Sequence, residues 1–277
     1  MSNPVKKGNH PLDSDTISLI SKRYKTITKS INEDFWDSSS ETSHSRYVGS
    51  YGRGTAIGTS DLDVLFELPD DVYEHFTSLI CNGQSRLLQA VKDSIIDTYP
   101  KTDIKGDGQV VVVKFSDGMR FEILPAFRNI GWLGNWDGTY KYPDTHMSGN
   151  WMSTNPKAEQ EAISDKNGYY KSNGLLRDTC KHIRYIRSDS FSNYHLSGIL
   201  IDSFVYVAIG AWHFLRADEE RGKSSSNITF EQHLLDYYNN QYPLADIITP
   251  KLYAPGSGMK LDCDDWDVLG KVLNKMV

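Results

Sequence analysis

The segment that decides the fold covers residues 47–67 and reads YVGSYGRGTAIGTSDLDVLFE. Gly49 and Ser50 open a loop rich in glycine and hydroxyl residues, and Asp61 and Asp63 lead from it into an apolar run. Residues i and i+2 of a strand point to the same face, so the two carboxylates project together while the residue between them enters the core. Such a pair suits Mg²⁺, which prefers hard oxygen ligands. The alternative for a pair of this kind is a solvated turn.

The loop between the Gly-Ser pair and the aspartates has the composition of a phosphate-binding turn. Gly49 has no Cβ to block a phosphate from the backbone N–H groups. Thr55, Thr59 and Ser60 add hydroxyl donors, and Arg53 is either a phosphate contact or a solvated charge. A glycine-rich surface turn is the competing interpretation. Because the two aspartates follow directly, the phosphate-binding interpretation is favoured.

A third acidic residue lies in the segment QVVVVKFSDGMRFEILPAF, residues 109–127. Two β-rich runs flank the turn signal SDG, which predicts a hairpin. In the second run, Arg120 and Glu122 alternate with apolar residues and therefore share the face opposite to them. A carboxylate in the middle of such a run is costly unless it is paired or bound to metal. Glu122 is therefore the candidate third ligand of a two-metal site, and an exposed edge-strand glutamate is the alternative.

The rest of the chain predicts a mixed α/β first half and a helical second half. Helices are expected over about 15–35, with Asp13 or Ser14 as the cap, and over about 83–98, 156–165, 174–188, 197–215, 230–239 and 264–275. Residues 132–155 have no clear period and predict a long ordered connection with three buried tryptophans. We therefore expect a core domain over 1–155, which includes the N-terminal helix, and a helical domain over 156–277. A cleft between two such domains is a suitable ligand site.

Composition narrows the class of protein. The 277 residues are 39% hydrophobic and 24% charged, with a net charge of −6. This balance argues against a dedicated nucleic-acid coat protein. The three cysteines are far apart and predict reduced thiols and no zinc site. The N-terminus lacks an apolar signal segment and no long apolar run follows, so we expect a cytoplasmic protein with no membrane partner.

The motif GSYGRGTAIGTSDLDV resembles the G-S…D-x-D signature of the polymerase β-type nucleotidyltransferases. The resemblance is to the branch with 2′-5′ oligoadenylate synthases, cyclic GMP–AMP synthase and the bacterial cGAS/DncV-like enzymes. FEILPAF is similar to that branch's third-acid strand, with Glu122 in place of the usual aspartate. The resemblance implies an α/β (α+β) bilobal fold, with a mixed-sheet palm, a C-terminal helical lobe and the active site in the cleft between them. It implies that Asp61, Asp63 and Glu122 bind two Mg²⁺ ions, with Mn²⁺ as a substitute, and are catalytic. Gly49 and Ser50 would bind the nucleotide.

The helical half extends the resemblance. LLRDTCKHIRYIR is similar to the helix whose lysine meets the phosphates of the incoming nucleotide, which gives this role to Lys181. SNYHLSGILIDSFV is similar to the following segment, where a small polar residue touches phosphate and an aromatic ring stacks on a base. These roles fall on Ser192 or Asn193 and on Tyr194. From the residues alone, Lys181 could equally belong to a solvated basic face, and Tyr194 could pack against its neighbours.

The function implied by the resemblance is synthesis of a cyclic di- or trinucleotide second messenger from nucleoside triphosphates. ATP and a second triphosphate would be the substrates, and the setting would be bacterial anti-phage signalling (CBASS) with an effector encoded in the same operon. The chain has no zinc-binding cluster and no positive balance, so no duplex DNA requirement is expected. Two alternatives remain: transfer of one nucleotidyl group to a protein, RNA end or small molecule, and a catalytically inactive nucleotide-binding sensor. Asn167 and Asn173 are candidates for base recognition or for turn and helix-cap positions.

Overall fold

The computed structural model describes residues 3–146, 149–217, 219, 228–241 and 250–277. The chain forms two compact units. We call the first, Leu12–Gly52 with Asp61–Lys157, the sheet unit, and the second, Met1–Pro11 with Arg53–Ser60 and Ala158–Val277, the helical unit. The division after Lys157 lies near the expected boundary at residue 155. Two stretches expected in the core domain, Met1–Pro11 and Arg53–Ser60, belong instead to the helical unit.

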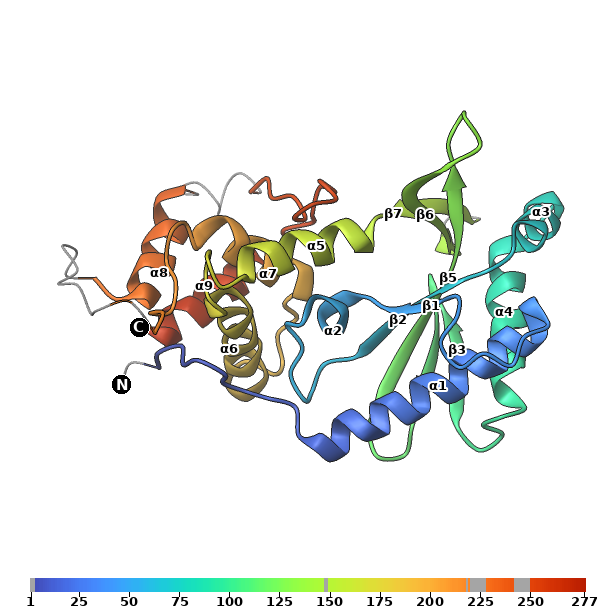
Figure 1. Cartoon of the computed structure of the whole chain (residues 1–277), viewed down its shortest axis with the longest axis horizontal. Helices are drawn as coiled ribbons and strands as arrows, with labels where there is room; N and C mark the ends of the chain where they lie inside the picture. The colour runs from blue at the N-terminus through green and yellow to red at the C-terminus, as the bar shows by residue number, and fades with distance from the viewer. Residues whose placement is uncertain (1–2, 147–148, 218, 220–227, 242–249) are drawn as a thin grey trace. The chain divides into compact units, whose positions relative to one another are not determined.

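The sheet unit is built on a mixed seven-stranded sheet within the described residues (Figure 1). Its order is β1-β2-β5-β4-β3, and β6 pairs with both β5 and β7. Strands β2 and β5 are parallel, and the other pairs are antiparallel. The strands are β1 (Ser45–Tyr47), β2 (Leu62–Glu67), β3 (Asp103–Asp107), β4 (Val110–Lys114), β5 (Arg120–Ile130), β6 (Trp136–Asp144) and β7 (Asn150–Thr154).

Helices α1 and α4 cover one face of this sheet (Figure 1). The predicted cap is confirmed, because the Asp13 side chain accepts a hydrogen bond from the backbone N–H of Thr16 at 2.8 Å. Apolar side chains of both helices pack with those of β2, β4 and β5 in one core. The helices of the sheet unit are α1 (Ser14–Trp36), α2 (Gly49–Arg53, whose last residue belongs to the helical unit), α3 (Asp70–Ser78) and α4 (Gly83–Ile96). The sequence did not predict α2 or α3, which are short.

The expected long connection over 132–155 is wrong, because it contains strands β6 and β7. In β6 the residues that alternate onto the packed face are aromatic (Trp136, Tyr140 and Tyr142) and are interrupted by Gly138, so the strand lacks the aliphatic run of β4. Strand β7 is only five residues long and has no alternation. The burial of three tryptophans is also wrong. Trp132 lies at the tip of the β5–β6 hairpin and is 99% exposed, whereas Trp136 and Trp151 are half-buried. Trp132 lies in the turn outside both strands, whereas Trp136 and Trp151 lie on strands and pack against buried clusters.

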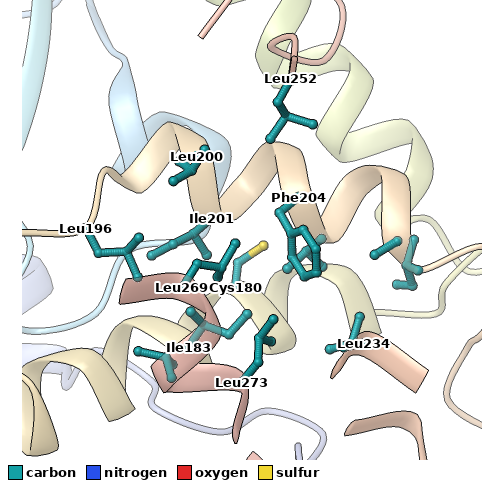
Figure 2. Packing of buried hydrophobic residues seen from close by; sticks show 14 of the residues in the cluster. Cys180, Ile183, Leu196, Leu200, Ile201, Phe204, Leu234, Leu252, Leu269 and Leu273 are labelled. Atoms are coloured by element: carbon teal, nitrogen blue, oxygen red, sulfur yellow. The ribbon is translucent and has the colours of Figure 1, made fainter. Parts of the chain in front are cut away.

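The helical unit packs around a second core of side chains from its helices (Figure 2). Its helices are α5 (Pro156–Asn167, which begins in the sheet unit), α6 (Leu175–Ser190), α7 (Gly198–Ala208), α8 (Phe230–Gln241) and α9 (Trp266–Met276). The expectation that α7 reaches residue 215 is wrong, because the helix ends at Ala208 and Gly210 takes a φ of +53°. In the described part of the chain, no helix has the length and apolarity needed to cross a membrane.

Candidate metal and nucleotide site

Two of the three predicted acids lie side by side on neighbouring strands. In the parallel β2–β5 pair, Asp63 lies directly opposite Glu122. Leu62 and Val64, which alternate with Asp63, are buried in the core on the other face. Strand β5 lies between β2 and β4, so the edge-strand interpretation of Glu122 is wrong. The mixed sheet therefore presents these two carboxylates together on the face away from α1 and α4.

The third acid, Asp61, is linked to Glu122 through an arginine. One terminal nitrogen of Arg120 lies 2.5 Å from a Glu122 carboxylate oxygen, and the other lies 3.6 Å from Asp61 Oδ2. Burial raises the pKa of Glu122 above its ordinary value, and the Arg120 charge opposes this rise. The nearby Asp61 charge raises it further. Burial and the Arg120 guanidinium therefore act on the pKa of Glu122 in opposite directions.

The chemistry of these donors fits a hard divalent cation. All three groups are carboxylates, the ligand type that Mg²⁺ and Mn²⁺ prefer. In the described residues, no three His, Cys, Asp or Glu side chains are arranged to hold a metal ion as they stand. Arg120 supplies a positive charge between Asp61 and Glu122. A guanidinium that bridges two acids acts there as a stand-in for a cation.

Gly49 packs directly against Asp63. Its φ is +56°, and a Cβ at this position would lie only 1.8 Å from Asp63 Oδ2. The backbone N–H of Val48 also donates to the Asp63 carbonyl at 2.8 Å. Ser50, the other residue of the predicted pair, is half-buried in α2. The glycine is therefore required by close contact with the aspartate as well as by its backbone conformation.

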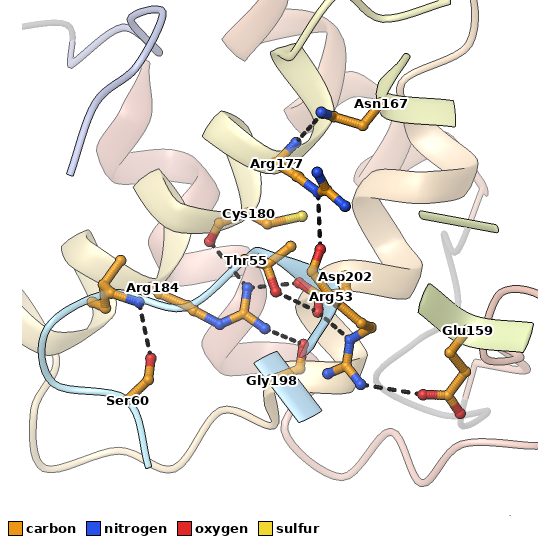
Figure 3. A network of polar contacts seen from close by, with 11 residues as sticks. Arg53, Thr55, Ser60, Glu159, Asn167, Arg177, Cys180, Arg184, Gly198 and Asp202 are labelled. Atoms are coloured by element: carbon orange, nitrogen blue, oxygen red, sulfur yellow. Dashed lines mark hydrogen bonds and ion pairs between the residues drawn. The ribbon is translucent and has the colours of Figure 1, made fainter. Parts of the chain in front are cut away.

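Both interpretations of Arg53 are wrong, because it is a buried structural residue of the helical unit. It is 6% exposed, and its Nε donates to Asp202 at 2.8 Å (Figure 3). Its Nη1 lies 3.2 Å from Glu159, and the Thr55 hydroxyl also donates to Asp202 at 2.9 Å. Arg184 reaches the second Asp202 oxygen at 2.6 Å. Burial raises the pKa of Asp202, but the two guanidiniums outweigh it and lower that pKa to about 2.

The remaining predicted nucleotide contacts lie in the helical unit. Lys181 is half-buried on α6, and Ser192, Asn193 and Tyr194 lie on the exposed segment between α6 and α7. Tyr194 is 48% exposed, and Lys271 Nζ lies 4.6 Å from the centre of its ring. A half-exposed aromatic ring is compatible with base stacking. The roles of these four residues remain predictions.

The two asparagines considered for base recognition have structural partners. The Asn167 side chain accepts a hydrogen bond from the backbone N–H of Arg177 at 2.9 Å, which caps the first turn of α6. Asn173 has a φ of +51° and donates to the carbonyl of Phe214 at 3.0 Å. The turn and helix-cap interpretation is therefore the one that the structure supports.

The family emerges from comparison with known proteins. The profile described as "Second Messenger Oligonucleotide or Dinucleotide Synthetase domain" matches residues 9–167, more than half of the chain. The chain belongs to this family. The match contains the Gly-Ser pair, both aspartates and Glu122. It ends at α5, before the segments that carry the predicted lysine and tyrosine.

A curated relative and two solved structures are similar to this chain. A Bacillus cereus (strain VD146) protein named "Probable cyclic nucleotide synthase" is 30% identical over 124 residues, which span 43% of this chain and 36% of the relative. The chain thus matches about a third of that relative's length. The structure of an Elizabethkingia meningoseptica CdnE cyclic dinucleotide synthase with GTP and Apcpp has a TM-score of 0.62 at 11% identity, over 96% of this chain and 97% of that one. The CdnE c-di-GMP synthase of Capnocytophaga granulosa has a TM-score of 0.62 at 14% identity, over 95% and 78%.

These matches confirm the predicted family and the mixed α/β fold of the cGAS/DncV-like nucleotidyltransferases. Sequence reasoning missed the role of Arg120 in the site. The signal was present, because the alternation that places Glu122 away from the core also places Arg120 beside it on the same face. It also missed the Arg53–Asp202 pair, for which no local pattern exists because the two residues are 149 positions apart.

Proposed function

We propose that this protein is a metal-dependent nucleotidyltransferase that joins nucleoside triphosphates into a cyclic di- or trinucleotide second messenger. Pyrophosphate would be released at each transfer, ATP would be one substrate, and a second triphosphate could supply the other base. The curated relative is named a probable cyclic nucleotide synthase, and the Elizabethkingia cyclic dinucleotide synthase was solved with GTP and Apcpp. In this proposal the product acts as a signal in bacterial anti-phage defence, in the cytoplasm, and is read by an effector encoded nearby.

The observation that carries the proposal is the packing of Gly49 against Asp63, with Glu122 directly opposite Asp63 on the next strand. This contact joins the Gly-Ser pair to the acids through the fold. A phosphate near the Gly49 backbone would therefore lie close to the carboxylates. Such a neighbourhood is what transfer of a nucleotidyl group requires, because charge neutralisation and positioning dominate this chemistry.

Asp61, Asp63 and Glu122 would hold two divalent cations. When bound, these cations neutralise phosphate charge and lower the pKa of the attacking ribose hydroxyl. The three carboxylates keep the site anionic in their absence and set its preference for hard ions. Gly49 and Ser50 would leave room for phosphate at the backbone. The chain itself supplies no covalent intermediate in this account.

We assign further nucleotide contacts to Lys181, to Ser192 or Asn193, and to Tyr194. A lysine provides a point charge for phosphate, and an exposed tyrosine ring accepts any base by stacking. The half-exposed ring of Tyr194 supports this assignment. These residues would bind the nucleotide without acting on the reacting atoms, so we expect their loss to raise KM more than it lowers kcat.

The test is incubation of the purified chain with labelled triphosphates and Mg²⁺ or Mn²⁺, followed by phosphatase treatment and chromatography. Label that resists phosphatase indicates a cyclic product. Linear products would retain terminal phosphates that the phosphatase removes. Transfer of a single nucleotide to another acceptor would require that acceptor and give no product from triphosphates alone. An inactive sensor would bind ATP without releasing pyrophosphate.

Substitution of the acids separates chemistry from folding. Asp61→Ala and Asp63→Ala should abolish product formation and leave the circular dichroism spectrum unchanged. The matched control is Asp103→Ala, because Asp103 is an exposed carboxylate on β3 of the same sheet. Near-normal turnover in either aspartate variant would remove the pair from the catalytic site.

A further inference from the structure

Arg120 lies on the face of the sheet that carries Asp63 and Glu122, and the proposed function does not use it. It comes two residues before Glu122 on β5 and therefore projects from the same side of the sheet. Its two terminal nitrogens contact different acids, Glu122 at 2.5 Å and Asp61 at 3.6 Å. Its Nε is buried and, among the described residues, has no hydrogen-bond partner. The guanidinium is thus directed toward the two carboxylates.

The surroundings explain why a cation is needed at this place. On the β4 side, Glu122 lies opposite Val112, which is 3% exposed and offers no charge. On the β2 side it lies opposite Asp63, which carries the same charge as Glu122. The Glu122 side chain is only 23% exposed, so water screens these carboxylates incompletely. Arg120 places a positive group between Glu122 and Asp61 and relieves the repulsion between these two carboxylates.

We propose that Arg120 is a built-in counter-cation that competes with divalent metal for Asp61 and Glu122. It is a positioning residue that holds these acids while metal is absent and lowers the affinity of the site for metal. This inference rests on the proposed metal site. Binding of metal then exchanges the two ion pairs of Arg120 for metal–carboxylate contacts. The site is charged in both states, and no proton or electron needs to move.

The consequence is opposite to that expected of a metal-supporting residue. Removal of Arg120 takes away one unit of positive charge beside a divalent ion, so affinity for the metal should rise by about tenfold. The same change leaves the Asp61 and Glu122 carboxylates without the guanidinium that pairs with both, so the metal-free protein should become less stable. Metal should then restore more stability in the variant than in the wild type.

The experiment titrates Mn²⁺ into the full chain without nucleotide and follows free Mn²⁺ by electron paramagnetic resonance. The variants are Arg120→Met and Arg120→Gln, the second of which keeps polar ends without charge. The matched control is Arg128→Met, because Arg128 lies on the same strand and pairs with Glu67 at 3.0 Å, away from the acids. Mn²⁺ binding that is lost in the Asp63→Asn variant is assigned to the proposed site. Thermal unfolding with and without Mn²⁺ is measured on each variant.

The expected result is Mn²⁺ binding that depends on Asp63, tightened about tenfold in both Arg120 variants and unchanged in Arg128→Met. Equal or weaker Mn²⁺ affinity in both Arg120 variants, with normal Asp63-dependent binding in the wild type, overturns this inference and leaves the proposed function intact. Absence of Asp63-dependent binding in every variant overturns both. If Arg120→Met does not fold, Arg120→Gln and the wild-type titration still decide between these results.

Discussion

The contact between Gly49 and Asp63 yields a prediction whose size follows from the structure. Replacement of Gly49 by alanine adds a Cβ at 1.8 Å from Asp63 Oδ2, and 3.0 Å is the shortest contact that such atoms ordinarily make. The carboxylate oxygen must therefore move by at least 3.0 − 1.8 = 1.2 Å, or the backbone must shift by a similar amount. The change acts at the centre of the proposed site.

Two effects should be measurable. Alanine at the φ of +56° costs about 1–2 kcal/mol of conformational energy, which should appear as an equal loss of unfolding free energy. Misplacement of a reacting group by about 1 Å costs roughly 100-fold in rate. We therefore expect Gly49→Ala to lower product formation from labelled triphosphates by about 100-fold or more while the protein remains folded.

The matched control is Gly58→Ala in the segment that follows α2. Among the described residues, a Cβ at Gly58 would meet no heavy atom within 4 Å, and the φ of this glycine is not positive. Its substitution should leave both activity and the urea midpoint close to wild type. If Gly49→Ala retains near-normal activity, or if both glycine variants lose activity equally, the contact between Gly49 and Asp63 does not set the geometry of the site.

The remaining predictions concern the helical unit. Asp202→Asn leaves two buried guanidiniums without their shared acid and should lower the free energy of unfolding in urea by about 3–5 kcal/mol. The control Asp267→Asn breaks an exposed pair with a neighbouring lysine and should lower it by less than about 1 kcal/mol. Equal losses in the two variants would refute the structural role of Asp202. Burial lowers the pKa values of His10 and His182, so the unfolded chain binds more protons below about pH 6.5 and stability should fall as the pH drops from about 7.5 to about 5.5. The urea midpoint should show this fall, and His182→Gln should reduce it; an identical fall in that variant contradicts the assignment. Lys181→Ala should raise KM for ATP more than it lowers kcat in initial-rate measurements, and an unchanged KM would exclude Lys181 from the site.

The elements that have a local sequence pattern could be predicted from the sequence. The apolar stripes of α1 and α4 and the SDG turn between β4 and β5 are local patterns, and each element is present in the structure. The shared face of Arg120 and Glu122 follows from strand alternation alone. The position of Asp63 opposite Glu122 does not, because the parallel pairing of β2 and β5 is a long-range property of the sheet.

The wrong predictions have physical reasons of the same kind. Arg53 looks like a surface charge locally, and only the distant Asp202 and Glu159 make its burial favourable. Strand β6 alternates aromatic and not aliphatic residues and is interrupted by a glycine, and β7 is only five residues long, so neither has the aliphatic run that marks β4. Trp132 is exposed although its size favours burial, since it lies at the tip of a hairpin turn. In each case the outcome depends on partners that a local window cannot contain.

The most direct test is a crystal structure of the full chain grown with Mn²⁺ and a non-hydrolysable ATP analogue, with anomalous diffraction data. We predict manganese bound by Asp61, Asp63 and Glu122 beside the triphosphate, with Arg120 released from at least one acid. Anomalous peaks absent from these carboxylates, with Arg120 still bridging Asp61 and Glu122 beside a bound nucleotide, would contradict the proposed metal site.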